Sequence, residues 1–228
     1  MAGGRVATLC AVLLLAAACG SRAPGAGVPP GASAPLTAPA SEAPQRTPPP
    51  SPTVLPSATA APADEAAIRG RAKDALAALR AKDLARFASF VHPAKGVRFT
   101  PYTFVQPGKD VVLSRAAVAK GLADPQRYLW GYTDGKGDPM DWTLGEFFER
   151  HLWTRDYAAA PVTLFDHYPE VRGNKFDNTQ KAYPGGHTVE QYFPARPNTL
   201  DWSGLRLVFE RDGGEWYVVG AIHDEWTI

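Results

Sequence analysis

The final stretch of the sequence, SGLRLVFERDGGEWYVVGAIHDEWTI over residues 203–228, constrains the fold more than any other. Two apolar runs of strand-forming residues lie on either side of Asp212-Gly213-Gly214, which indicates a β-hairpin. Both alternating sets of positions in these runs are apolar, so both faces of the hairpin must be covered. We therefore expect the hairpin at the centre of a sheet whose other strands and covering helices come from earlier in the chain.

The charges beside the loop favour one register of this hairpin. A two-residue loop would place an acidic residue opposite Glu215, whereas a three-residue loop over residues 212–214 pairs Arg211 with Glu215. We expect the three-residue loop. It predicts one face made of Leu205, Leu207, Phe209, Tyr217, Val219, Ala221 and His223, and another made of Val208, Trp216, Val218 and Ile222.

Composition changes near residue 63 and separates a folded part from what precedes it. Twelve of the 22 prolines fall in residues 1–63, whereas all 24 aromatic residues come later. We therefore expect one folded domain over residues 64–228. It carries 21 basic and 22 acidic residues. No clustered basic excess or nucleic-acid motif occurs, so no nucleic-acid partner is expected.

The N-terminal segment has the pattern of an export signal. Arg5 precedes a 13-residue apolar run, which as a helix spans about 20 Å and is too short for a bilayer core of about 30 Å. Residues 15–19, LAAAC, resemble the bacterial lipobox. The resemblance implies a lipoprotein signal peptide over residues 1–18, cleavage before Cys19 and lipidation of its thiol. The alternative is an ordinary signal peptide that is cut elsewhere.

The segment that follows is rich in Pro, Ala, Ser and Thr and has no aromatic residue. Such a composition buries too little surface to fold, so residues 19–63 are expected to be a lipidated cysteine followed by a disordered tether. The domain would then be anchored to the cell membrane or the outer membrane and face the extracytoplasmic side. Because the only cysteines are Cys10 and Cys19, the domain has neither a disulfide nor a zinc site built on thiolates.

Periodicity and capping patterns predict the elements of the domain. The expected helices cover residues 64–80, 84–91, 114–121 and 143–152, and the expected strands cover 97–105, 127–133, 162–167, 188–193 and the closing hairpin. Residues 169–186 are expected to be a long loop. Successive β elements after a helical pair indicate an α+β fold with a curved antiparallel sheet.

This order of elements resembles a known superfamily. The segments ALRAKDLARFASFVHP and RDGGEWYVV, in their places before and at the end of the strands, resemble the nuclear-transport-factor-2-like (SnoaL/ketosteroid-isomerase-like) cone fold. The resemblance implies a sheet curved into a cone, with the N-terminal helices packed on its concave face. More narrowly, HPAKGVRFTPY and GAIHDEWTI resemble a group of uncharacterised bacterial lipoproteins.

Three residues are candidates for catalysis within such a cone: His223, His92 and Arg98. His223 could exchange protons beside an acid, but Asp224 points to the opposite face of a strand, and a core histidine is the alternative. His92 precedes Pro93 at a helix end, where satisfying the helix terminus is the alternative. Arg98, like Arg206, needs a carboxylate if it is buried, and a structural ion pair is the alternative to a ligand.

The candidate ligand pocket consists of aromatic residues and His223: Tyr128, Trp130, Tyr217 and His223. Packing in the core is the alternative for these aromatics. His151 lies on a predicted helix and is expected to be solvated. The sequence has no HExxH, no GxSxG and no phosphate-binding loop, so no metal and no cofactor are expected.

Two functions remain open. The leading hypothesis is a non-catalytic, lipid-anchored domain that binds a small apolar ligand or an envelope protein. The alternative is a cofactor-free enzyme, similar to an isomerase or dehydratase, that performs acid–base chemistry in the cone. A homodimer formed through the outer sheet face is a further expectation and predicts a contiguous exposed apolar patch.

Overall fold

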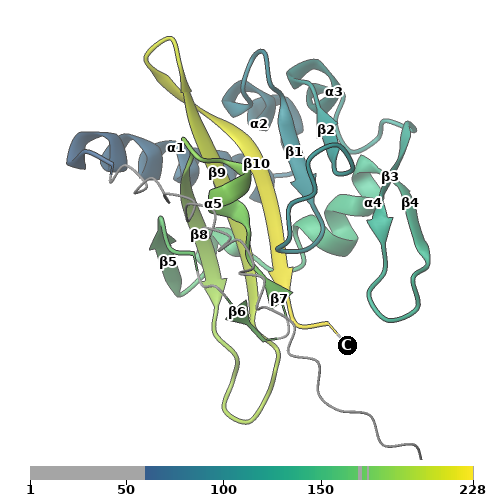
Figure 1. The fold of residues 1–228 in the computed structure, drawn as a ribbon. Helices are drawn as coiled ribbons and strands as arrows, with labels where there is room; N and C mark the ends of the chain where they lie inside the picture. The colour runs from purple at the N-terminus through teal and green to yellow at the C-terminus, as the bar shows by residue number, and fades with distance from the viewer. Residues whose placement is uncertain (1–59, 169–170, 174, 228) are drawn as a thin grey trace, which may run out of the picture. The chain divides into compact units, whose positions relative to one another are not determined.

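The structure, a computed structural model, describes residues 60–168, 171–173 and 175–227. The predicted signal peptide, Cys19 and the tether up to residue 59 lie outside these residues. None of the described helices is both long enough and apolar enough to cross a membrane. The fold is α+β. Helices cover one face of a six-stranded sheet, and a thinner layer made mostly of loops covers the other face (Figure 1).

The sheet is mixed, which corrects the expectation of a purely antiparallel one. Its strands lie side by side in the order β2 (Val111–Leu113), β1 (Val97–Thr100), β10 (Glu215–Glu225), β9 (Ser203–Asp212), β8 (His187–Phe193) and β5 (Val162–Phe165). All neighbours are antiparallel except β1 and β10, in which Phe99 pairs with Ala221 in parallel. Parallel pairing needs a long connection, and here residues 101–214 lie between the two strands. The prediction that the closing hairpin lies at the sheet's centre is confirmed.

The loop of the closing hairpin differs from the predicted one. Asp212 pairs with Glu215 across a two-residue turn of Gly213 and Gly214, whose φ angles are +55° and +93°. Two glycines with positive φ give the turn that matches the twist of the strands, and this geometry outweighs the repulsion between the two carboxylates. Arg71 also neutralises part of it, because its Nη1 lies 2.8 Å from Glu215.

A β-bulge between Val218 and Gly220 then shifts the register of the hairpin. As a result, Tyr217 and Val219 leave the face on which the sequence pattern had placed them. The helix-covered core includes instead, from β9 and β10, Leu205, Leu207, Phe209, Trp216, Val218 and Ala221. His223 lies on that same face, as predicted, and its partner in the observed register is Leu205.

Helices and a second hairpin cover this face of the sheet. The helical elements are α1 (Pro62–Arg80), α2 (Leu84–Phe90), α3 (Arg115–Ala119), α4 (Leu144–Phe147), the π-helix η1 (Phe148–Leu152) and the 3-10 helix η2 (Tyr157–Ala159). The hairpin pairs β3 (Arg127–Tyr132) with β4 (Pro139–Thr143). The apolar stripe predicted for the first helix is buried at Ile68, Ala72, Ala75, Leu76 and Leu79.

The other face of the sheet is covered by a thinner layer. Figure 1 shows α5 (Thr179–Ala182) on the side of the sheet opposite α1. Tyr183, just after α5, and Val105, after β1, pack with Val208, Val219 and Ile222 in a second apolar cluster. The small hairpin of β6 (Val171–Arg172) and β7 (Lys175–Phe176) lies nearby in the chain. Described parts of the predicted 169–186 loop therefore form short elements.

Local capping places the helices where the sequence predicts them. The side chains of Asp83, Ser114 and Thr143 each accept a hydrogen bond from a backbone N–H in the first turn of a helix. Thr143 and Glu146 form the predicted capping box. The helix predicted over 143–152 continues past α4 as the π-helix η1. The first strand ends at Thr100 rather than Val105, because Pro101 cannot donate to the sheet.

Candidate functional site

A buried polar cluster surrounds His223 in the core beneath the helices. The His223 side chain has no exposed surface, and its Nε2 lies 3.1 Å from the Tyr157 hydroxyl and 3.3 Å from Thr154 Oγ1. The Tyr157 hydroxyl lies 2.5 Å from Ser203 Oγ. A chain of hydroxyl groups thus connects the imidazole to η2 and β9, so His223 is held in one orientation.

His151 joins this cluster, contrary to the expectation that it is solvated. Its ring lies edge-on to His223 with centroids 5.9 Å apart, and it stacks on Trp142 at 5.5 Å. The π-helix η1 explains the difference. Trp153 N donates a hydrogen bond to Phe148 O, five residues earlier, and this wider turn carries His151 to the core side. The sequence shows a helical pattern here but gives no signal of the wider turn.

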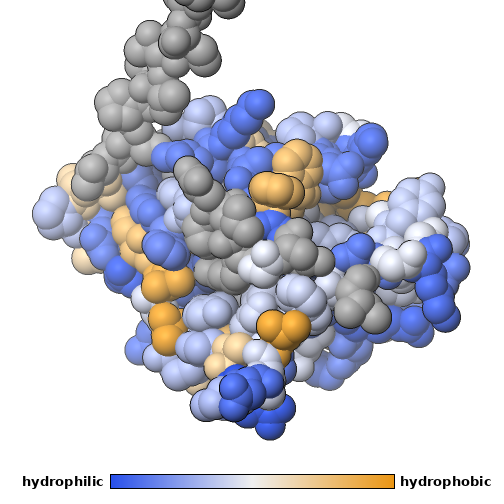
Figure 2. Space-filling view, turned by 60° about the horizontal axis from the view of Figure 1, so that its bottom comes forward, coloured by the Kyte–Doolittle hydropathy of each residue, from blue (hydrophilic) through white to orange (hydrophobic). Residues whose placement is uncertain are grey.

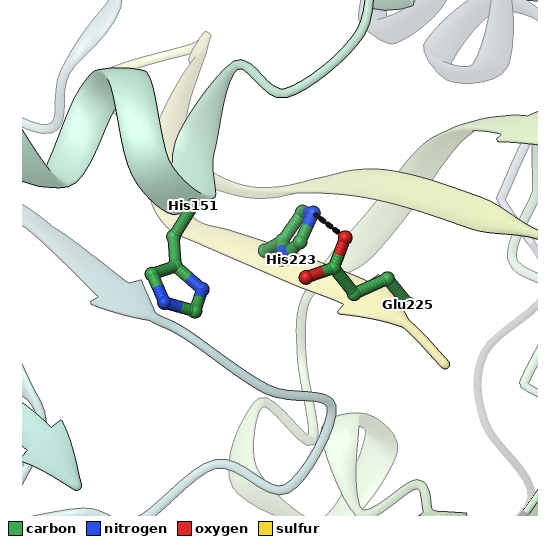
Figure 3. A group of neighbouring side chains, drawn as sticks. All are labelled: His151, His223 and Glu225. Atoms are coloured by element: carbon green, nitrogen blue, oxygen red, sulfur yellow. Dashed lines mark ion pairs between the residues drawn. The ribbon is translucent and has the colours of Figure 1, made fainter. Parts of the chain in front are cut away.

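Glu225 places a carboxyl group beside His223. Residues two apart on a strand point to the same face, and Glu225 Oε2 lies 3.7 Å from His223 Nε2 (Figure 3). The same alternation places Asp224 on the other side, where Thr103 Oγ1 donates to its carboxylate at 2.5 Å. The prediction that Asp224 is a poor partner for His223 is therefore confirmed, and the same rule applied one residue further identifies Glu225.

Burial keeps both imidazoles neutral at ordinary pH. Burial lowers the pKa of His223 to about 3, and the neighbouring His151 adds to this shift. Burial also lowers the pKa of His151 to about 4, with further contributions from the charges of Lys175 and Arg150. The pKa of Glu225 is raised by burial, although the nearby Lys175 opposes the shift. The cluster therefore offers neutral nitrogen lone pairs beside a carboxyl group.

Lys175 lies close enough to the cluster for its charge to act on His151, His223 and Glu225. Its Nζ lies 4.2 Å from the centroid of the Tyr102 ring and 4.0 Å from Asp134 Oδ2. Burial lowers the pKa of Lys175, while the charges of Asp224, Asp134 and Glu225 raise it. One ammonium group therefore lies among three carboxyl groups.

His151, His223 and Glu225 are close enough to act on one bound atom or ion. One ligand atom from each lies within 4.8 Å of the others. Two neutral imidazoles and a carboxylate can coordinate a metal ion, and His223 with Tyr157 can also transfer a proton. Figure 3 shows that the two elements that supply these side chains, η1 and β10, meet at this point.

An aromatic groove lies on the surface next to this cluster. We use this name for Tyr102, Phe104, Leu129, Tyr132 and Phe176, which line two cavities of about 500 Å³ and 370 Å³. The two cavities share Tyr102, Phe104 and Tyr132, and they lie where the segment after β1 meets β3. Tyr102 also contacts the buried cluster, since its ring lies edge-on to His151 at 5.9 Å.

The other predicted catalytic residues lie elsewhere. His92 is buried in the turn before β1, where its Nδ1 accepts hydrogen bonds from the backbone N–H of Ala94 and Lys95. Arg98 alternates with the buried Val97 and Phe99 on β1, so it points to the face of the sheet opposite His223. Neither residue joins His223 in a common site.

Of the four predicted pocket residues, Trp130 alone lines one of these two cavities. The Trp130 ring stacks on Phe147 with centroids 4.0 Å apart and lies 5.5 Å from the Tyr128 ring. Trp130 is therefore mainly part of the core, and Tyr128 packs against it. Tyr217 faces the guanidinium groups of Arg71 and Arg115 at 5.1 and 5.4 Å. His223 belongs to the buried cluster rather than to the lining of either cavity.

Comparisons with known proteins give likenesses of fold only. Neither a model of a known protein family nor a curated protein matches the chain. One similar solved structure is a domain of unknown function with a cystatin-like fold from Nostoc punctiforme, with 14% identity over 74% of this chain and 81% of that one, at a TM-score of 0.34. Another, from Xanthomonas campestris, is described as a calcium/calmodulin-dependent protein kinase II association domain, with 14% identity over 74% of this chain and 93% of that one, at a TM-score of 0.30.

Proposed function

We propose that this protein is a lipid-anchored, extracytoplasmic domain that binds a small, largely apolar molecule in the aromatic groove without transforming it. The observation that carries the proposal is the convergence of exposed apolar side chains on two adjoining cavities. Phe104, Tyr132 and Phe176 are 52%, 59% and 68% exposed. Large aromatic side chains exposed together in a concave surface are typical of a binding site.

The dimensions and polarity of the groove favour a small molecule over a protein partner. Cavities of about 500 Å³ and 370 Å³ lie within the range of ligand pockets. Polar groups also line both cavities, with Lys109 and Asp110 in one and Asp134 and Lys175 in the other. On the face that Figure 2 shows, apolar residues form separate patches among hydrophilic ones. A flat apolar body with a charged or hydrogen-bonding end suits this arrangement.

Two further parts of the proposal rest on the sequence. The lipobox-like residues before Cys19 support an anchor, and the tether over residues 19–63 would hold the domain away from the membrane. The order of elements supports a nuclear-transport-factor-2-like sheet that curves into a cone, with the N-terminal helices on its concave face. The groove would then lie at the margin of that cone.

Fluorescent probe binding tests the groove. We expect the full chain carrying Cys19→Ser to bind 1-anilinonaphthalene-8-sulfonate, and each of Phe104→Ala and Tyr132→Ala to weaken binding about tenfold, since each removes roughly 1–2 kcal/mol of apolar contact. Leu200→Ala is the matched control, because Leu200 is 54% exposed and outside the groove. Equal affinities in all variants, with native near-UV circular dichroism, would refute the proposal.

The anchor has its own test. Mass spectrometry of the mature protein from a bacterial host should find Cys19 as the first residue, carrying acyl chains, and Cys19→Ala should leave an unprocessed precursor. An unmodified N-terminus at another residue would show an ordinary signal peptide instead. This result would leave the groove proposal untouched.

A second candidate function is acid–base catalysis, which the cluster at His223 favours. The hydroxyl of Tyr157 lies 3.1 Å from His223 Nε2, and Tyr102 connects the cluster to the groove through His151. An enzyme of this kind should exchange protons of a bound ketone with D2O, detected by NMR, and Tyr157→Phe should abolish the exchange. Ligands that bind in the groove and retain all their protons would favour the non-catalytic function.

A further inference from the structure

We propose that His151, His223 and Glu225 form a binding site for one divalent transition-metal ion, of which Zn²⁺ is the representative. Each residue would supply one ligand atom. This inference is independent of ligand binding in the groove. It also departs from the expectation that the domain holds no metal, which was based on the lack of a recognisable sequence motif.

The geometry is the first argument. One ligand atom from each residue lies within 4.8 Å of the others, and the pair His223 Nε2 and Glu225 Oε2 is already at 3.7 Å. Ligand atoms bound at 2.0–2.2 Å to a common ion lie about 3–3.5 Å apart. Small side-chain rotations close the difference. Glu225 can make them, because its side chain is 31% exposed.

The second argument comes from a buried nitrogen atom. Among the described residues, the Nδ1 atom of His151 is buried and has no hydrogen-bond partner. Buried polar atoms are nearly always satisfied, so this unpartnered nitrogen calls for an explanation. A metal ion shared with His223 and Glu225 supplies one, since a neutral imidazole nitrogen can coordinate a metal.

A hydrogen bond to the Pro101 backbone holds the ring of His223. Outer hydrogen bonds of this kind orient the histidine ligands of metal sites. The Nε2 atom of His223, which would be the ligand atom, contacts the hydroxyls of Thr154 and Tyr157, and an ion bound to Nε2 would displace these contacts.

Charges around the site have opposing effects. The positive charges of Lys175, Arg150 and Arg155 face members of the cluster and disfavour a cation. The carboxyl groups of Asp134, Asp224 and Glu225 surround Lys175 and offset its charge. Lys175 is therefore the residue whose removal should strengthen metal binding.

The donor set selects the type of ion. Two imidazoles and one carboxylate suit Zn²⁺, Fe²⁺ or Co²⁺, whereas Ca²⁺ and Mg²⁺ prefer oxygen ligands throughout. Three protein ligands leave at least one coordination position for water or another molecule. The π-helix η1, which carries His151, also fits a metal site, since short π-helical turns occur frequently at functional sites.

The test is titration with Zn²⁺ in competition with a chromophoric chelator. It uses the full chain without an affinity tag, carrying Cys10→Ser and Cys19→Ser to remove thiols that bind zinc. We expect one Zn²⁺ per chain and no competition from millimolar Mg²⁺ or Ca²⁺. His151→Phe, which keeps a ring stacked on Trp142, and Glu225→Gln should each weaken binding at least tenfold. Lys175→Met should strengthen it.

His187 provides a matched control. Its Nδ1 lies 2.6 Å from Asp166 Oδ2, which makes a partly buried histidine–carboxylate pair with only two ligands. His187→Phe should leave the stoichiometry and affinity unchanged. The proposal is overturned if the parent chain binds no stoichiometric Zn²⁺, or if folded His151→Phe and Glu225→Gln bind it as tightly as the parent. Co²⁺ absorption of the parent chain should show nitrogen and oxygen coordination.

Discussion

Arg206 and Glu190 form an ion pair inside the protein, with Nη2 and Oε2 2.9 Å apart and both side chains only 2% exposed. The two residues are partners in the register of β8 and β9. The Asp177 carboxylate binds the other side of the guanidinium, and Thr179 Oγ1 accepts a hydrogen bond from Nη1 at 2.8 Å. The prediction that a buried arginine in this hairpin takes a structural carboxylate partner is confirmed.

Removing one partner of this ion pair should be strongly destabilising. We expect Arg206→Met to lower the free energy of unfolding by about 3–5 kcal/mol, because it leaves two buried carboxylates without their cation. Urea denaturation measures the effect. Lys82→Ala, which breaks an ion pair whose side chains are 55% and 57% exposed, should change stability by less than about 1 kcal/mol. Similar losses for both variants would contradict the prediction.

Tyr183 should make stability fall at alkaline pH. Burial raises the pKa of Tyr183 to about 12, so its protonated form stabilises the fold fully below pH 10, and this contribution is lost as the pH rises toward 12. We expect a loss on the order of 1–2 kcal/mol over that range. Tyr183→Phe should reduce the slope in pH-dependent denaturation. Part of the slope should remain, because burial also raises the pKa of Tyr168 to about 12.

A methyl group at Gly220 should disturb the packing of Tyr183. A Cβ at this position would lie 2.9 Å from the Tyr183 hydroxyl oxygen and 3.0 Å from Val208 Cγ2. We expect Gly220→Ala to cost about 1–3 kcal/mol of stability. In a double-mutant cycle, Tyr183→Phe should recover part of that loss. Gly70→Ala in α1 is the control, because open space surrounds it and the helix should gain about 0.5–1 kcal/mol.

The like charges beside the hairpin turn should destabilise it slightly. Asp212→Asn removes the repulsion from Glu215, and we expect a gain of roughly 0.2–0.5 kcal/mol that shrinks in 1 M NaCl. Glu215→Gln should give no such gain, because it also breaks the 2.8 Å contact with Arg71. An equal gain from both substitutions would show that the repulsion, rather than the Arg71 contact, dominates at Glu215.

Features that depend on neighbouring residues were predictable from the sequence. Asp83, Ser114 and Thr143 cap their helices through contacts within one turn, so a short segment contains the information. The apolar faces of the closing hairpin likewise predicted its central place in the sheet. His223 was recognisable as a residue of interest because it is a polar residue on a strand that must be buried.

Features that depend on distant segments were not predictable in the same way. The bulge at Val219 and the π-helix η1 each change the spacing at which side chains return to the same face of their element, and no residue pattern signals either change. They decide that Tyr217 faces away from His223 and that His151 faces toward it. The position of Glu225 could have been predicted from the sequence, since Glu225 lies two residues beyond His223 on one strand.

The place of β10 between β1 and β9 also determines the order in which the sheet can assemble. The first strand pairs with the last one, as in Phe99 with Ala221, so the two halves of the sheet join only after β10 has been synthesised. Until then, β1 and β9 each have an edge without its neighbour, and those edges are prone to pair with other chains. Contacts this distant in sequence also slow folding. We therefore expect the domain to fold late and to depend on protection from aggregation while its chain is being made.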